Sequence, residues 1–109
     1  MRIVIKYTNL DSTPAMQAFI EDKIGAVAKL LKRWEEGREL TAMIEVARTT
    51  KHHHKGDVFY AEASIELPGK LLRAEEKAWD IRQAIDKVKQ KLKLEITRFK
   101  ERGALRGEK

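Results

Sequence analysis

Hydrophobic and polar residues alternate along four segments of the chain, while in two longer segments the hydrophobic residues recur every three or four positions. Alternation is typical of a strand that buries one face, and it predicts strands over residues 2–7, 40–48, 58–67 and 71–76. The longer spacing places side chains on one stripe of a helix, and it predicts one helix that begins at Pro14 and another over residues 80–102. The order of elements is therefore strand, helix, three strands, helix.

Cap and turn signals fix several boundaries of these elements. Thr13 followed by Pro14 is a typical helix start, because threonine caps the first N–H groups and proline fits the first helical position. Gly37 is expected to end this helix, since glycine adopts the left-handed conformation at little cost. Pro68 and Gly69 predict a tight turn, so the third and fourth strands should form a hairpin.

These elements predict an α+β fold of the order β-α-β-β-β-α. Short connections make the last three strands an antiparallel meander, and the first strand can pair beside them after the helical crossover. Each helix has one apolar stripe, so both helices are expected to pack on one face of a four-stranded sheet. The other face is expected to be open to water and to carry Arg2, Lys6, Thr41, Glu45, Tyr60, Glu62, Ser64 and Glu66. We expect a single domain over residues 1–102 and a flexible tail over residues 103–109, which have two glycines and no periodicity.

The positive charge of the chain is concentrated in the second helix and the residues after it. Residues 1–76 contain twelve Lys or Arg and twelve Asp or Glu, whereas residues 77–109 contain eleven and five, which is the whole net charge of +6. On the helix, two basic rows flank the apolar stripe: Arg82, Lys89, Lys93 and Lys100 on one edge, and Lys87, Lys91, Arg98 and Arg102 on the other. A solvated helix face would explain one basic row, but two rows on one helix favour a surface that binds a polyanion.

Several classes of function find no support in the sequence. The absence of cysteine excludes thiolate zinc sites and fits the reducing cytoplasm, and no apolar run approaches the ~20 residues of a membrane span. The N-terminus is too charged for a signal peptide, so we expect a cytoplasmic protein. Neighbouring carboxylates at 35–36 and 75–76 diverge, no serine or threonine stands in a nucleophile-elbow motif, and the glycines of a phosphate-binding loop are absent. We therefore expect no enzyme, no cofactor and no small-molecule substrate.

Two further groups of residues are candidates for binding. His52, His53 and His54 are consecutive and cannot converge on one metal ion, so we expect no metal site; they should add positive charge or contact phosphate or a base. Trp34 lies on the apolar stripe of the first helix and is expected to pack in the core. For Trp79, two interpretations stay open: it anchors the start of the second helix, or it is exposed and stacks on a base.

Most of the chain, from the first strand to about Arg102, carries a family resemblance. Its most specific parts are Thr13-Pro14, the segment HHHKGDVFYAEASIELPGKLLRAEE with its Pro68-Gly69 hairpin, and the DIRQAID motif that opens the lysine-rich helix. In these parts the chain resembles the ribosome hibernation-promoting factors, a family that includes the ribosome-associated inhibitor A proteins and was once labelled sigma-54 modulation proteins. The resemblance implies a fold similar to double-stranded-RNA-binding domains. It also implies binding to the small ribosomal subunit between head and body, where the family occupies the mRNA channel and overlaps the A- and P-site tRNA positions.

The resemblance further implies which basic residues contact ribosomal RNA. Basic positions of the family are matched by Lys23, Lys91, Arg98, Lys100 and Arg102. To these we add Lys87, Lys89 and Lys93 from the basic rows, and Lys51, Lys55, Lys70 and Arg73 from loops and strand ends. Arg82 stands where the family has an aromatic residue and is a candidate for a different phosphate contact, while Leu94 replaces an expected basic residue. Because three of its four members match the family, the row that begins at Lys87 is expected to contribute more than the row that begins at Arg82.

Three hypotheses of function follow. The first is a non-enzymatic, ribosome-binding inhibitor of translation that fills space needed by mRNA and tRNA. The alternative is a general double-stranded-RNA-binding module without ribosome specificity. A third is a protein-interaction module that dimerises through the open sheet face or Leu94. The chain of 109 residues resembles the short form of the family, which lacks a second, dimerising domain, so we expect a monomer away from the ribosome.

Overall fold

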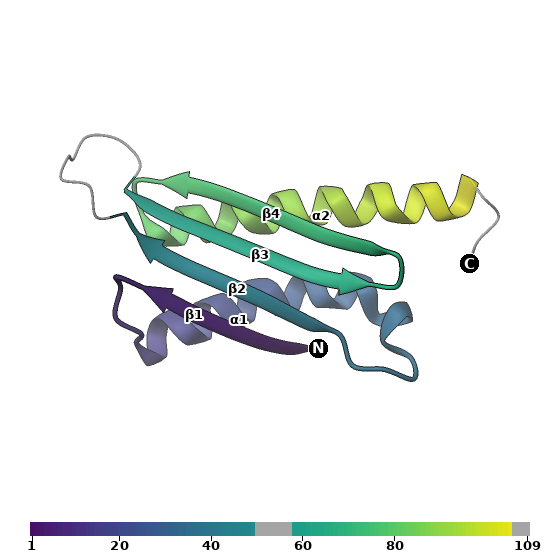
Figure 1. The fold of residues 1–109 in the computed structure, drawn as a ribbon, viewed down its shortest axis with the longest axis horizontal. Coiled ribbons are helices and arrows are strands. Elements are labelled where there is room, and N and C mark those ends of the chain that lie inside the picture. The colour runs from purple at the N-terminus through teal and green to yellow at the C-terminus, as the bar shows by residue number, and fades with distance from the viewer. Residues whose placement is uncertain (50–57, 106–109) are drawn as a thin grey trace.

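The computed structural model describes residues 1–49 and 58–105, and its element order confirms the predicted β-α-β-β-β-α fold (Figure 1). The elements are β1 (Arg2–Thr8), α1 (Pro14–Ala28), the 3₁₀ helix η1 (Lys29–Glu35), β2 (Thr41–Arg48), β3 (Phe59–Leu67), β4 (Lys70–Ala78) and α2 (Ile81–Leu105). Helix α2 ends three residues beyond its predicted end, and residues 106–109 lie outside the described range. Within the described residues, no helix is long and apolar enough to cross a membrane.

The four strands form one sheet in the order β1-β2-β3-β4. Strand β1 pairs with β2 in parallel, as the helical crossover between them requires, and the remaining pairs are antiparallel. Gly69 has a φ of 77°, a left-handed conformation that closes the tight β3–β4 turn predicted at Pro68 and Gly69. The register places Ile65 of β3 opposite Ala42 of β2 and Leu72 of β4, so that these inward side chains form one row across the sheet.

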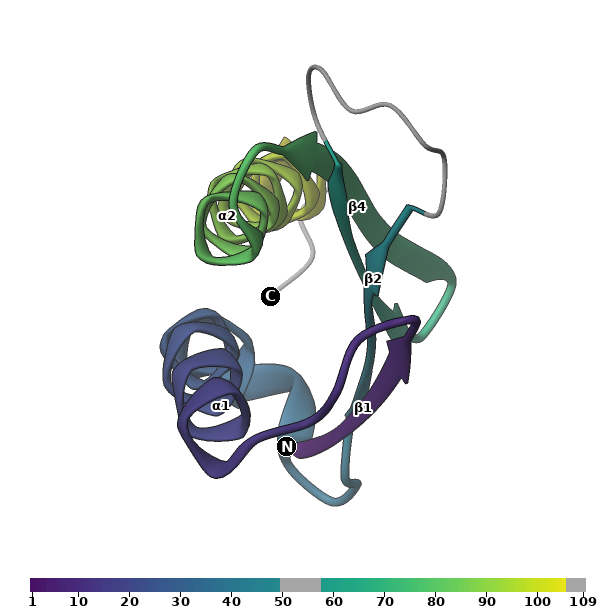
Figure 2. The same cartoon turned by 90° about the vertical axis from the view of Figure 1, so that its left-hand side faces the viewer.

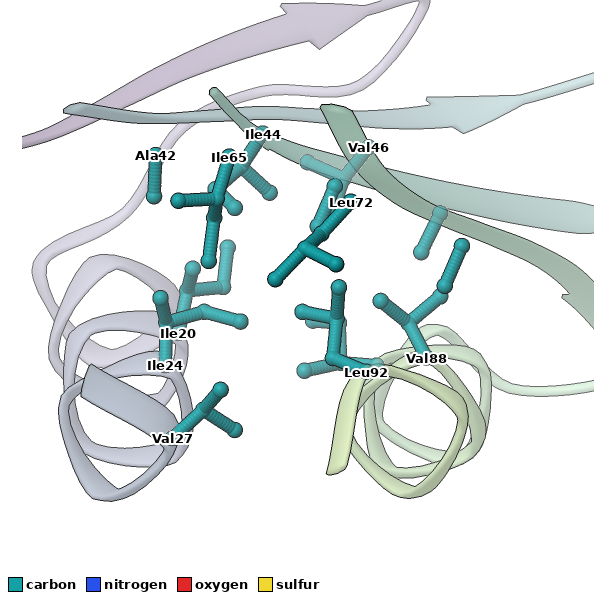
Figure 3. Packing of buried hydrophobic residues seen from close by; sticks show 14 of the residues in the cluster. Ile20, Ile24, Val27, Ala42, Ile44, Val46, Ile65, Leu72, Val88 and Leu92 are labelled. Atoms are coloured by element: carbon teal, nitrogen blue, oxygen red, sulfur yellow. The ribbon is translucent and has the colours of Figure 1, made fainter. Parts of the chain in front are cut away.

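Both helices lie on the same face of the sheet, as their single apolar stripes predicted (Figure 2). Ile20, Ile24 and Val27 of α1 and Val88 and Leu92 of α2 point into the space that the two helices and the sheet enclose (Figure 3). These five side chains are at most 2% exposed. Burial of such a side chain stabilises a domain by about 1.5–3 kcal/mol. Because α2 cannot rotate without exposing these side chains, its opposite face is the one that is free to bind a partner.

The first helix begins as predicted but ends differently. Thr13 Oγ1 accepts a hydrogen bond of 3.1 Å from the backbone N–H of Met16, which confirms the predicted cap. The prediction of one continuous helix to Gly37 was wrong, because the chain tightens into η1 after Ala28. In a 3₁₀ helix residues i and i+3 eclipse, so Leu31 and Trp34 share one side. Leu31 is fully buried there and the Trp34 ring lies 5.2 Å from the Phe99 ring of α2, in agreement with the expected packing role of Trp34.

Candidate nucleic-acid interface

The two basic rows of α2 lie on opposite sides of its buried stripe and face different neighbours. We call Arg82, Lys89, Lys93 and Lys100 the α1-facing row, and Lys87, Lys91, Arg98 and Arg102 the β4-facing row. The Arg82 guanidinium lies 4.8 Å from the centre of the Phe19 ring in α1, and Lys100 Nζ lies 5.8 Å from that of Trp34 in η1. On the other side, Lys91 contacts β4. Each row therefore borders a different part of the domain.

The β4-facing row is partly neutralised by carboxylates of the protein itself. Lys91 Nζ lies 2.7 Å from Glu76 Oε2 of β4 and donates a hydrogen bond of 3.3 Å to the backbone carbonyl of Glu75. This hydrogen bond from Lys91 to Glu76 is the main reason that the pKa of Glu76 is lowered. Arg98 lies 3.9 Å from Glu95 one turn earlier in the helix. Two of the four cations in this row are thus already paired.

The α1-facing row has no such partners among the described residues. No carboxylate of residues 1–49 or 58–105 lies within 4.0 Å of its four cations. Arg82, Lys93 and Lys100 are exposed and Lys89 is half-buried. Asp86, the acidic residue nearest this row in the helix, is bound by Lys23 of α1 at 3.2 Å. Lys23 thereby cancels the one negative charge on the side of α2 that faces α1, and the surface between the helices stays positive.

The open face of the sheet has a different character. The register places Glu45, Glu62 and Glu75 directly opposite one another on β2, β3 and β4. Like charges in such a row repel, and the row is tolerated because other side chains neutralise or bond it. Thr8 Oγ1 donates a hydrogen bond of 2.7 Å to Glu45, while Arg73 lies 2.6 Å from Glu62 and 3.2 Å from Glu75.

Tyr60 completes this network on the open face. Its hydroxyl donates hydrogen bonds of 3.0 Å to Glu62 and 2.7 Å to Glu75. Partial burial and these two carboxylates raise the pKa of Tyr60, and the Tyr60 and Arg73 hydrogen bonds lower the pKa of Glu75. Because Tyr60, Glu62, Arg73 and Glu75 bond one another, the cluster is a structural network of the sheet. At the edge of β4, Arg73 also borders a hollow that Lys91 and Arg98 of α2 line from the other side.

The structure separates the remaining predicted site residues. Lys70 begins β4 beside the hairpin turn, far along the strand from the start of α2. Lys51, Lys55 and the histidines at 52–54 lie outside the described residues. Within residues 1–49 and 58–105, no group of three or more His, Asp or Glu side chains is arranged to hold a metal ion. The described candidates therefore gather mainly on α2.

Two large apolar side chains are exposed on or next to α2. Trp79 is 62% exposed and Leu94 is 50% exposed. Of the two interpretations of Trp79, exposure favours the second, in which the ring is presented to solvent. A residue that precedes a helix cap is often anchored by a large apolar side chain at the fourth position of the helix. In α2 the fourth position holds Ala84, whose small, buried side chain offers the Trp79 ring little to pack against.

Comparison with known proteins shows to which family the chain belongs. The sequence model of the family described as sigma 54 modulation protein / S30EA ribosomal protein matches residues 3–104. The chain belongs to this family. The resemblance drawn from the Pro68-Gly69 hairpin and the DIRQAID motif is thereby confirmed.

Individual relatives of this sigma 54 modulation / S30EA family support the assignment. The chain is 35% identical over 100 residues to the ribosome hibernation promotion factor of Lactococcus lactis subsp. cremoris, a match that covers 90% of the chain and 49% of that protein. The chain thus spans about half the length of this relative. The N-terminal domain of Thermus thermophilus Protein Y is 32% identical, with a TM-score of 0.68 and coverage of 91% of this chain and 99% of that one. A ribosomal subunit interface protein from Coxiella burnetii has the same fold, with a TM-score of 0.67 at 22% identity and coverage of 93% and 99%.

Proposed function

We propose that this protein is a non-enzymatic, cytoplasmic inhibitor of translation that binds the small ribosomal subunit through contacts to ribosomal RNA. The observation that carries the proposal is the α1-facing row of α2, whose four cations have no carboxylate partner among the described residues. Membership of the sigma 54 modulation / S30EA family supports the ribosome as the partner, as do relatives described as a hibernation promotion factor and a subunit interface protein.

The mechanism is steric and electrostatic. Cations along one side of α2 bind phosphates of folded RNA, and the domain behind them occupies space that mRNA and tRNA need. Each phosphate contact releases condensed counterions, which makes affinity fall with salt. The buried face of α2 is fixed against β3 and β4, so the row is presented at a constant spacing. Affinity then depends on shape and charge rather than on base-specific contacts.

The pairing of side chains changes the expected weight of the two rows. The family resemblance alone favoured the β4-facing row. In that row Lys91 and Arg98 already have carboxylate partners, and a phosphate must compete with these partners. Lys89 and Lys93 have no carboxylate within 4.0 Å among the described residues, so each gains more when it meets a phosphate. We therefore propose that the α1-facing row supplies the larger share of the affinity.

Charge reversal tests this function directly. In the double variant Lys89→Glu/Lys93→Glu, affinity for purified small subunits should fall, and the slope of log affinity against log salt should drop by roughly 1.4–1.8, because about 0.7–0.9 is lost per phosphate contact. Lys91→Glu/Arg98→Glu should reduce the slope less. Cosedimentation with small subunits at several salt concentrations measures affinity and slope, and a cell-free translation assay measures inhibition.

The matched control reverses the same charge on the other face. Arg2 and Lys6 lie exposed on the open face of β1, so Arg2→Glu/Lys6→Glu changes net charge equally and should leave binding nearly unchanged. Equal losses for all three pairs would mean that only net charge matters, and the proposed interface would be wrong. Complete displacement by an excess of an unrelated RNA duplex would point to a general RNA binder.

A further inference from the structure

Trp79 is the most exposed aromatic side chain among the described residues. The other aromatic rings there pack against the core or, in Tyr60, donate hydrogen bonds to carboxylates, whereas Trp79 is 62% exposed. Single exposed apolar residues are ordinary, but tryptophan exposes the largest apolar area of any side chain and is the residue most enriched where a partner is bound.

The backbone on both sides of Trp79 is fixed. Ala78 is fully buried and pairs with Phe59 at the end of β4. On the other side, the carbonyl of Asp80 accepts the first helical hydrogen bond from Ala84 at 3.0 Å, and its carboxylate accepts one from the N–H of Arg82 at 3.4 Å. The ring is therefore presented from a two-residue connection between two ordered elements, which reduces the entropy lost when a partner stacks on it.

The neighbouring charges indicate the kind of partner. Lys77 and Arg82, two residues before and three residues after the tryptophan, are exposed cations. Arg82 is also the first member of the α1-facing row, which runs from there to Lys100 over about 27 Å of helix. Trp79 thus stands at the N-terminal end of the positive surface. A planar ring beside a row of cations is the arrangement by which proteins hold an unpaired base and its phosphates together.

We propose that Trp79 is a stacking platform for an unpaired nucleobase of the RNA whose phosphates contact the α1-facing row. This inference rests on the proposed function and adds to it that the bound RNA is single-stranded at the start of α2. Stacking requires only the flat face of a base, so the site selects unpaired bases over duplex and has little preference among the four bases.

Fluorescence and affinity test the platform separately. In a Trp34→Phe variant Trp79 is the only tryptophan, so its emission reports on this site alone. A single-stranded oligoadenylate decamer should quench that emission, and a blunt RNA duplex of equal length should not. Trp79→Ala should weaken binding of the decamer and of purified small subunits by about 5- to 150-fold, the range found when a stacked aromatic is removed. Trp79→Tyr keeps a ring and should stay within about threefold of the unmodified protein.

Controls separate this inference from the function on which it rests. Leu94→Ala removes an exposed apolar side chain within α2, away from Trp79, and should leave affinity for the decamer and for small subunits unchanged. Thermal melts check that each variant is folded. If the unmodified protein binds small subunits with a salt-dependent affinity and Trp79→Ala binds equally well, the platform is wrong and the proposed function stands. A loss for subunits without a loss for the decamer would indicate a protein contact and would also overturn the platform. Failure of the unmodified protein to bind subunits would contradict the proposed function itself.

Discussion

Lys91 is a basic residue of α2 whose contacts stabilise the fold. Its ammonium group bonds both the carboxylate of Glu76 and the backbone carbonyl of Glu75 on β4. Strand β4 is an edge of the sheet, and edge carbonyls that lack partners can pair with another chain. Lys91 thus ties α2 to the strand and covers part of its edge, a role that its position in a basic helix does not reveal.

This contact predicts a specific response to acid. The lowered pKa of Glu76 means that its contribution to stability is present above the ordinary glutamate pKa and is lost as pH falls through the folded-state value. In Lys91→Met the main cause of the shift is gone, so the variant should be less stable at pH 7 and should lose less on acidification from pH 5 to pH 3. Melting temperatures across this range measure the effect.

Lys93→Met is the matched control for Lys91→Met. It removes the same charge from the same helix, but Lys93 has no carboxylate within 4.0 Å among the described residues, so its acid response should follow that of the unmodified protein. Parallel curves for all three proteins would show that the Lys91–Glu76 pair does not contribute.

At the scale of elements, the periodicity of the sequence predicted those structural features that depend on the residues of a single segment. The alternation in the strands, the Thr13 cap and the stripe of α2 are local properties, and the structure confirms them. Three features depend on contacts between segments and were not predictable in this way. The change to η1 accompanies packing of Trp34 against Phe99 of α2, and the pairing of Lys91 depends on where α2 lies along β4.

The third such feature concerns the site. The alternation of β4 predicts that Arg73 lies on the open face, because Leu72 and Ala74 on either side of it point to the core. Arg73 also lines a hollow with Lys91 and Arg98 of α2, and this proximity depends on how α2 packs against the edge strand, which no single segment reveals.

Helix α1 contains a position where the sequence departs from what the helix favours. Gly25 lies in its interior, partly exposed, and a Cβ added there would meet no atom within 4 Å. Gly25→Ala should therefore stabilise the protein by about 0.5–1 kcal/mol, because alanine loses less backbone entropy on folding. For a domain of this size that is a rise in melting temperature of about 2–6 °C.

The contrasting substitution is Gly69→Ala. Its φ of 77° is left-handed, so alanine should destabilise the turn by about 1–2 kcal/mol although the added Cβ also meets open space. A lower melting temperature for Gly25→Ala would mean that α1 needs its glycine for a reason other than packing.

At the scale of the whole molecule, the two faces of the sheet differ in chemical character. The helical side holds the core and the α1-facing row of α2, and the open side holds a hydrogen-bonded network of carboxylates, Tyr60 and Arg73. The four strands also differ in how deeply their side chains are buried. Strand β3 is central and has four fully buried residues, whereas none of the seven residues of β1 is fully buried.

This difference predicts the order of local opening. Backbone amides of β1 should exchange with solvent before those of β3, because an edge strand with partly exposed side chains can separate without disturbing the core. Hydrogen exchange followed residue by residue by nuclear magnetic resonance measures this order. Simultaneous exchange of both strands would show that β1 opens only with global unfolding.

The parallel pairing of β1 also has a consequence for synthesis of the chain. Strand β1 emerges first, but β2, the strand it pairs with, is complete only 40 residues later, at Arg48. At about 5–20 residues per second, the newly made strand waits about 2–8 s without a partner. The exposed cations Arg2 and Lys6 alternate with its apolar residues and keep the waiting segment soluble, so the charges on the open face protect the nascent chain at the time when it is most able to aggregate.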